Sequence, residues 1–149
     1  MSPSFPLQSL LDLSQLRLDE AGRRLGELIS GEQEATKRLE LLIEYRGEYQ
    51  ARFVAAAQAG LAPREWQNFR SFLQRLDDAV NQADVLAKQS RQRTASGQKE
   101  WLAKRGKVKA FDTLAQRHQT QIDHHELRRE QKESDEHTAL RHGRNDDPK

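Results

Sequence analysis

The chain has 149 residues, of which 35% are hydrophobic and 32% are charged, with a formal net charge of +2. A mean hydropathy of −0.97 indicates too little apolar surface for a globular core, whereas an elongated coiled coil buries only a narrow stripe of each helix. The sequence has no cysteine, which excludes disulfides and thiolate metal sites and is typical of a reducing compartment.

The first residues, MSPSFPLQ, lack the basic region and the apolar run of a secretory signal. Nowhere does the sequence contain the roughly 18 consecutive apolar residues that span a bilayer. We therefore expect a soluble, cytoplasmic chain.

Residues 7–59 are predicted to form the first of two helical arms. Apolar side chains recur there at the 4-3 spacing of a coiled-coil seam, and the pattern is sustained far beyond the three or four heptads that distinguish a coiled coil. The seam positions are Leu11, Ser14, Leu18, Ala21, Leu25, Leu28, Ala35, Leu39, Leu42, Tyr49, Phe53 and Ala56, with Glu32 and Arg46 as polar intrusions. Such intrusions more often fix the register of a coiled coil than perform chemistry.

A chain reversal is predicted at residues 60–63. Gly60 suits the left-handed residue that closes a helix, and Pro63 suits the first turn of the next helix because its φ is already helical. The two arms should therefore run antiparallel.

The second arm is predicted over residues 64–139. Its seam begins with Trp66, Phe69, Leu73 and Leu76, but from Ala87 to Gly97 every seam side chain is small or polar. We expect this middle stretch to be weakly packed, with fraying or a bend.

If the turn is centred near Leu61, two residues face each other when their numbers add to about 123. The second arm is the longer one, so its C-terminal part extends past the start of the first arm. At 1.5 Å per residue the second arm would be more than about 100 Å long, against about 80 Å for the first arm. The fold class is all-α: one domain over residues 1–149, forming a long two-helix antiparallel coiled-coil hairpin with an unpaired C-terminal helical overhang. Residues 143–149 are expected to be disordered.

A basic band lies between Lys88 and Lys109, where eight basic residues and one acidic residue give a net charge of +7. Part of this charge faces acidic residues of the first arm. Nucleic acid is one partner that such a band indicates, but the band has a single aromatic residue, Trp101, and no recognition motif. An acidic protein partner is the alternative that we favour.

No catalytic, cofactor-binding or metal-binding residues are predicted. The five histidines lack the spacing of a metal site, since His124 and His125 are adjacent and so point about 100° apart on a helix. The sequence also lacks a glycine-rich phosphate loop and a Gly-x-Ser-x-Gly elbow. We expect a protein that is not an enzyme and has no small-molecule substrate.

The segments LLIEYRGEYQ (41–50) and GLAPREWQNFRSFLQRLDDAVNQ (60–82), with AGRRLGEL at 21–28, resemble the FliJ family of flagellar export proteins. The resemblance extends over most of the chain. It implies a soluble component of the flagellar type III export apparatus, built as a long two-helix coiled coil similar to the stalk of rotary ATPases.

The resemblance also implies partners: the export ATPase FliI, the export gate protein FlhA and export chaperones. The gate-contact surface of the family maps onto Leu42, Tyr45, Tyr49, Phe72, Leu76 and Ala79, of which Tyr45, Phe72 and Ala79 lie off the seam in a flanking position. At two positions that neighbour this surface, the chain has Arg38 and Ala83, where related sequences can carry other residues. The ATPase ring would receive the open end of the hairpin, represented by Leu7, Leu11, Leu18, Val108, Phe111 and Ile122.

The function expected from the resemblance is coupling of the ATPase ring to the export gate and handling of chaperones, in the cytoplasm and peripheral to the inner membrane. Two alternatives stay open. One is the equivalent stalk of a virulence type III secretion system, and the other is a helical protein that binds nucleic acid through the basic band.

Overall fold

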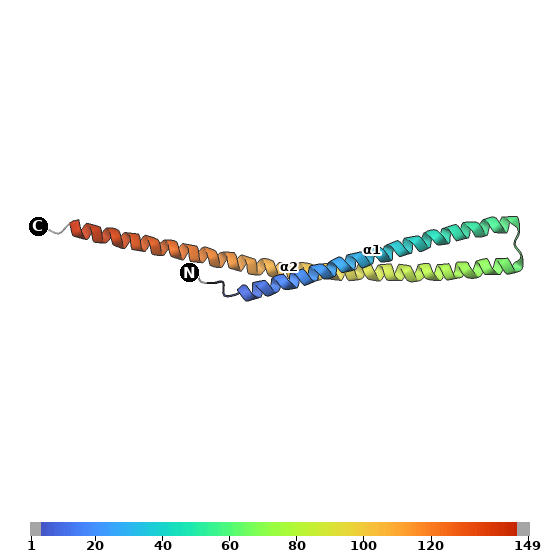
Figure 1. Cartoon of the computed structure of the whole chain (residues 1–149), viewed down its shortest axis with the longest axis horizontal. Helices are drawn as coiled ribbons and strands as arrows, with labels where there is room; N and C mark the ends of the chain where they lie inside the picture. The colour runs from blue at the N-terminus through green and yellow to red at the C-terminus, as the bar shows by residue number, and fades with distance from the viewer. Residues whose placement is uncertain (1–3, 146–149) are drawn as a thin grey trace. The chain divides into compact units, whose positions relative to one another are not determined.

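The computed structural model describes residues 4–145 and contains two helices in that range, α1 (Gln8–Ala59) and α2 (Pro63–Asn145). The predicted all-α helical hairpin is confirmed. The chain divides into two compact units. The turn unit is Asp19–Ala103, and the terminal unit combines the chain up to Leu18 with the chain from Lys104 onward. In each unit a part of α1 lies antiparallel beside a part of α2 (Figure 1).

The reversal between the helices occupies the residues between Ala59 and Pro63. Gly60 has φ 97°, and its N–H donates to the carbonyl of Ala57 at 3.2 Å. A side chain is disfavoured at that φ, which explains glycine at this position. Pro63 is the first residue of α2, where a missing N–H leaves no intrahelical hydrogen bond unmade.

Opposing residues follow the predicted pairing. Arg46 forms an ion pair with Asp77 in the turn unit, and the rings of Phe5 and His118 are 5.6 Å apart in the terminal unit. The residue numbers of both pairs add to 123, the value expected from the sequence. Arg46 was predicted as a polar intrusion that fixes the register, and its cross-helix partner agrees with that role.

The expected weak packing between Ala87 and Gly97 is wrong. Ala87 is 0% exposed, and Ala83 and Ala21 are 5% and 2% exposed. The Thr94 hydroxyl lies 3.3 Å from the carbonyl oxygen of Leu28 on the other helix. Within this stretch Ala87 is buried, and Ser90, Thr94 and Gly97 are half-buried. Small side chains let the two helices approach closely, so the seam packs here without large apolar residues.

Glycine at position 97 belongs to the same contact. A Cβ atom built there would lie 2.6 Å from a methyl group of Leu28, so the space that a side chain would need is filled by leucine. Counting large apolar residues along α2 misses this packing, because the volume comes from α1.

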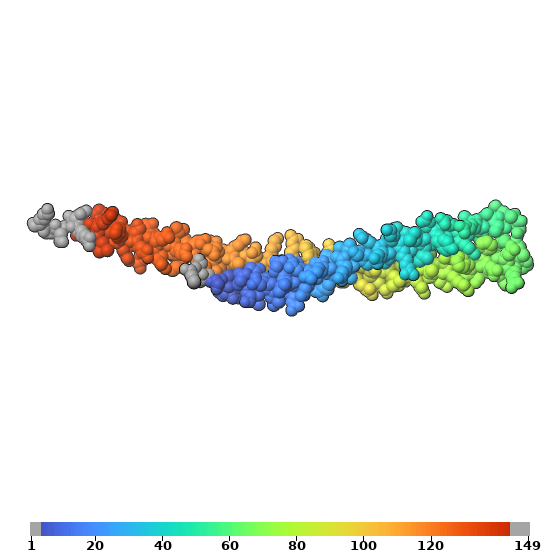
Figure 2. All heavy atoms as spheres, in the orientation of Figure 1, coloured from blue at the N-terminus to red at the C-terminus, as the bar shows by residue number. Residues whose placement is uncertain are grey.

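The C-terminal part of α2 is an overhang. Every side chain from Asp123 to Gly143 is exposed, whereas Ile122 is half-buried. In the view of Figure 2 no other segment of the described chain covers the end of α2, drawn in orange to red. The unpaired overhang in the predicted fold class agrees with this exposure.

The overhang ends later than predicted. The sequence indicated a helix end at residue 139 and disorder from residue 143, but α2 continues to Asn145. The next proline is Pro148, and glycine at position 143 costs a helix only about 1 kcal/mol, which is insufficient to end it here. Residues 146–149 lie outside the described residues, so the predicted disorder there stays a prediction. So does the assignment of one coiled-coil domain.

Candidate protein-interaction surfaces

A cluster of six aromatic rings lies beside the turn, in the turn unit. The aromatic cluster consists of Tyr45, Tyr49 and Phe53 on α1 and Trp66, Phe69 and Phe72 on α2. Adjacent ring centroids are separated by 4.6 Å for Tyr49 and Phe72 and by up to 6.5 Å for Tyr45 and Phe72. Aromatic pairs at such distances each contribute about 0.5–1.5 kcal/mol beyond area burial, so the cluster joins the two helices near their reversal.

The cluster is exposed at its two ends. Tyr45 is 43% exposed and Trp66 is 42% exposed, whereas the four rings between them are half-buried. Tyr45 has an edge-to-face contact with Phe72 alone among the described rings. The cluster therefore stabilises the hairpin through its middle and presents aromatic surface to solvent at each end.

The structure brings together three of the six predicted gate residues, because the ring of Phe72 contacts both Tyr45 and Tyr49. Leu42 and Ala79 are half-buried on the same two helices of the turn unit. Leu76 is only 6% exposed, so it has little surface to offer a partner. The assignment of these residues to a partner stays a prediction.

Phe72 is better covered than its flanking position suggested. Its ring packs between two tyrosines and is half-buried, so it contributes to the interior of the hairpin as well as to any surface. Of the two departures from the family pattern, Arg38 is exposed and Ala83 is buried. The change at Ala83 therefore affects packing between the helices rather than an exposed edge.

In the terminal unit, most residues predicted to meet the ATPase lie on the seam. Leu7 is 36% exposed. The other five, Leu11, Leu18, Val108, Phe111 and Ile122, are half-buried. Half-buried seam residues hold the hairpin together and leave limited area for a partner.

The exposed apolar surface of this unit comes instead from leucines that the heptad count missed. Leu10, Leu13 and Leu16 of α1 are 45%, 47% and 58% exposed, and Leu114 of α2 is 40% exposed. The signal was present in the sequence as leucine at every third position from Leu7 to Leu16. A count restricted to the two seam positions passes over it.

We also searched the described residues for a metal site and for a stretch that could span a membrane. Within residues 4–145 no group of three or more His, Cys, Asp or Glu side chains is arranged to hold a metal ion. Neither helix, over its described length, has an apolar stretch long enough to cross a membrane. The fold and its exposed apolar residues define a two-helix hairpin protein with surface suited to protein partners.

Comparisons with known proteins show to which family the chain belongs. Residues 3–147 match the family model described as "Flagellar FliJ protein". The chain is 33% identical to the flagellar FliJ protein of Salmonella typhi over 130 residues. This match covers 87% of this chain and 88% of that relative. The chain is 32% identical over 130 residues to the flagellar FliJ protein of Escherichia coli strain K12, with the same coverage of 87% and 88%. The chain belongs to the flagellar FliJ family, and its general assignment to flagellum biogenesis and export is thereby confirmed.

Proposed function

We propose that this chain couples the export ATPase to the export gate in flagellar protein export, as a structural linker without catalytic activity. The proposal rests on the family to which the chain belongs and on one observation, namely that each of the two compact units exposes apolar side chains. Both units expose aliphatic residues, but the exposed aromatic residues Tyr45 and Trp66 lie in the turn unit, and the large exposed apolar residues of the terminal unit are leucines. One chain therefore offers a surface in each unit for one of two partners.

The gate protein FlhA is assigned to the turn unit. Tyr45 and Trp66 leave more than two-fifths of their surface exposed while packing on the other rings of the cluster. Partly exposed aromatic residues held by neighbours are typical binding hot spots, because little side-chain entropy remains to be lost on binding. Tyr49, Phe72, Leu42, Leu76 and Ala79 would support this surface from within the hairpin.

The ATPase FliI is assigned to the terminal unit. The half-buried seam residues there maintain the pairing of α1 with α2, and exposed leucines such as Leu7 and Leu10 supply area for contact. Export chaperones are a third proposed partner of the chain. Such contacts would hold the protein in the cytoplasm, at the inner membrane through its partners only.

The test is a pull-down of the purified chain with the cognate ATPase and, separately, with the cytoplasmic domain of the gate. We expect Tyr45→Ala to reduce retention of the gate domain and leave the ATPase unaffected, and Leu10→Ser with Leu13→Ser to do the reverse. Loss of both partners in both variants, with helicity unchanged, would contradict two separate surfaces.

Two alternative functions can be distinguished from this one. The relatives are flagellar proteins, which favours flagellar export over a virulence secretion system. Nucleic-acid binding through the basic band would weaken steeply as salt rises, because it depends on phosphate contacts. Gate binding through aromatic residues should change little over the same range of salt.

A further inference from the structure

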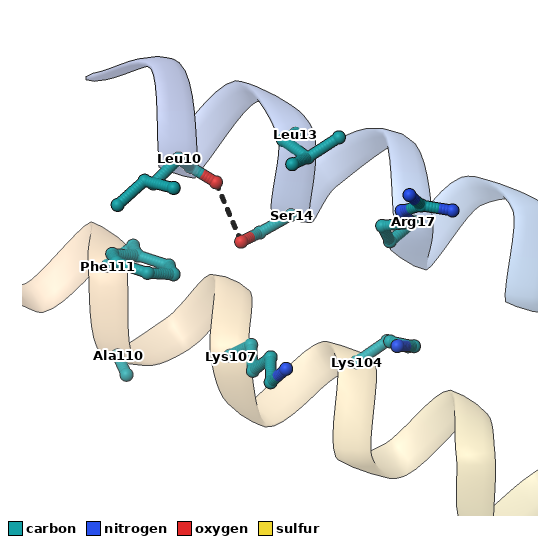
Figure 3. Close-up of a pocket in the computed structure, with 8 residues that line it drawn as sticks. All are labelled: Leu10, Leu13, Ser14, Arg17, Lys104, Lys107, Ala110 and Phe111. Atoms are coloured by element: carbon teal, nitrogen blue, oxygen red, sulfur yellow. Dashed lines mark hydrogen bonds between the residues drawn. The ribbon is translucent and has the colours of Figure 1, made fainter. Parts of the chain in front are cut away.

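A pocket opens between the two helices of the terminal unit, with a volume of about 410 Å³. Figure 3 shows side chains from both helices around it. It is lined by Leu10, Leu13, Ser14 and Arg17 of α1 and by Lys104, Lys107, Ala110 and Phe111 of α2. All eight residues belong to the same compact unit, so the pocket is a feature of that unit alone.

The lining combines apolar and cationic side chains. Leu10, Leu13 and Phe111 supply apolar surface, and the charge comes from one arginine and two lysines, with no acidic residue among the lining residues. The Ser14 hydroxyl donates to the carbonyl of Leu10 at 2.7 Å, so this polar group is already satisfied within α1. A ligand of this pocket needs apolar groups for its interior and negative charge for its edge.

The two lysines are available to such a ligand. Neither Lys104 nor Lys107 forms an ion pair with an acidic side chain in the part of the chain that the structure describes. Lys104 is half-buried and Lys107 exposed, and both line the pocket. A lysine beside apolar surface packs its aliphatic stem there and keeps its ammonium group in water, where the ammonium can meet a carboxylate. Both belong to the basic band, so the surrounding α2 surface adds positive potential.

We propose that this pocket binds an acidic amphipathic helix of a protein partner. Apolar side chains spaced i, i+3 and i+4 would enter between Leu10, Leu13 and Phe111, and carboxylates beside them would pair with Lys104 and Lys107. This is the helix-in-groove mode of recognition. The inference rests on the proposed assignment of the terminal unit to a partner and adds the chemistry of the segment that the partner presents.

A protein helix fits these residues better than nucleic acid does. Single strands are bound by stacking bases on exposed aromatic rings, but the one aromatic residue in the lining, Phe111, is half-buried. Leucine side chains cannot stack with bases, whereas they pack well against leucine, isoleucine or phenylalanine of a partner helix.

The test measures fluorescence anisotropy of a labelled synthetic peptide of about 18 residues, with blocked ends, leucines at i, i+3, i+4 and i+7 and glutamates on the flanking positions. We expect micromolar binding to the full chain. Lys104→Glu combined with Lys107→Glu should weaken it at least about tenfold, and Leu13→Ser about fivefold or more. A peptide with lysine in place of every glutamate should bind at least about tenfold more weakly.

The matched control is Arg91→Glu with Lys99→Glu, which makes the same change in net charge within the basic band at two residues that do not line the pocket. It should change affinity by less than about threefold. Should the charge reversal of Lys104 and Lys107 lower helicity, the same comparison is made with Lys104→Gln and Lys107→Gln. Equal weakening by the pocket pair and the control pair would overturn the proposal, as would equal binding of the two peptides.

Two further measurements are needed. One distinguishes a nucleic-acid site from a protein site, and the other shows whether a failure concerns the proposed ligand of the pocket or the proposed function of the chain. A labelled oligo-dT strand that binds and is weakened by the lysine pair, but not by Leu13→Ser, would make the pocket a nucleic-acid site and overturn the proposal. If the acidic peptide does not bind but the chain still retains the ATPase, the inference fails and the proposed function stands. If the peptide binds as described and the ATPase is not retained, the proposed function fails and the inference stands.

Discussion

Tyr45 and Phe72 contact each other but have different surroundings, so their roles can be separated. Tyr45 is 43% exposed and touches one ring, whereas Phe72 is half-buried between two tyrosines. We expect Tyr45→Ala to cost less than about 1 kcal/mol of unfolding free energy and Phe72→Ala about 2–3 kcal/mol, measured by thermal and urea unfolding. Tyr45→Ala should still weaken binding to the gate domain about tenfold.

The control for Tyr45 is Ile43→Ala, which removes an apolar side chain that is 52% exposed on another face of the same helix. It should affect neither stability nor gate binding appreciably. A Tyr45→Ala protein that unfolds as readily as Phe72→Ala would mean that the tyrosine is part of the interior, and the assignment of a gate surface to it would fail.

Substitution by alanine should change the free energy of unfolding in opposite directions at two glycines, Gly60 and Gly47. Gly60 has φ 97°, so alanine there is strained by about 1–2 kcal/mol and should lower stability. Gly47 lies inside α1 with nothing within 4 Å of a Cβ atom built on it, so alanine should raise stability by about 0.5–1 kcal/mol. Urea unfolding followed by circular dichroism measures both, and two changes of the same sign would contradict the geometry of the turn.

At the scale of the helices, the close contact of small residues makes α2 sensitive to added volume. Ala87 is 0% exposed against α1, and Ala95, two turns along α2, is exposed. Ala87→Leu should destabilise the hairpin by about 1–3 kcal/mol through overpacking, while Ala95→Leu should be nearly neutral. Similar melting temperatures for the two variants would show that the helices are not closely packed at Ala87.

The overhang should contribute little to the stability of the hairpin. From Asp123 to Gly143 all side chains are exposed, and the ion pair of Arg129 with Glu133, 3.7 Å apart, lies within one helix. Truncation after Ile122 is therefore expected to shift unfolding by less than about 1 kcal/mol, since exposed pairs of this kind contribute only a few tenths each. Truncation after Lys107, which removes half-buried seam residues such as Val108 and Phe111, should destabilise the chain clearly.

Much of the fold could be predicted from the sequence because a coiled coil repeats one local rule. The 4-3 spacing predicted two helices, and Gly60 with Pro63 located the reversal to within a residue. The pairing of Arg46 with Asp77 followed from that position alone. The end of α2 was misplaced because exposed helix ends depend on weak local preferences, with no packing to define them.

The candidate surfaces were less predictable, because exposure depends on both helices. A small residue such as Ala87 predicts a weak seam position, yet Ala87 is 0% exposed, and leucines of α1 fill the space beside Gly97 further along α2. Leu13 is off the seam, so the heptad pattern does not single it out, although it lines the pocket with Lys107, which is more than 90 residues further along the chain. The heptad pattern specifies which residues meet, but not how much surface each one leaves exposed.

At the scale of the whole molecule, the proposed coupling of two partners requires two separate surfaces on one chain. The turn unit offers aromatic residues ending in Tyr45 and Trp66, and the terminal unit offers leucines beside lysines. The interactions that contribute to binding free energy would differ between the two surfaces. Burial of aromatic rings would contribute at the turn unit, and burial of leucines together with charge complementarity at the terminal unit. Each surface should therefore be removable by mutation without affecting the other.

The most direct test of two separate surfaces is sequential binding to an immobilised chain, followed by biolayer interferometry. The gate domain is added to saturation first, and the ATPase is then added in the continued presence of the gate domain. We predict that the ATPase binds with the same affinity as it does to the chain alone, so that both partners occupy one chain together. Exclusion of the ATPase by the saturating gate domain would contradict a linker with two separate surfaces.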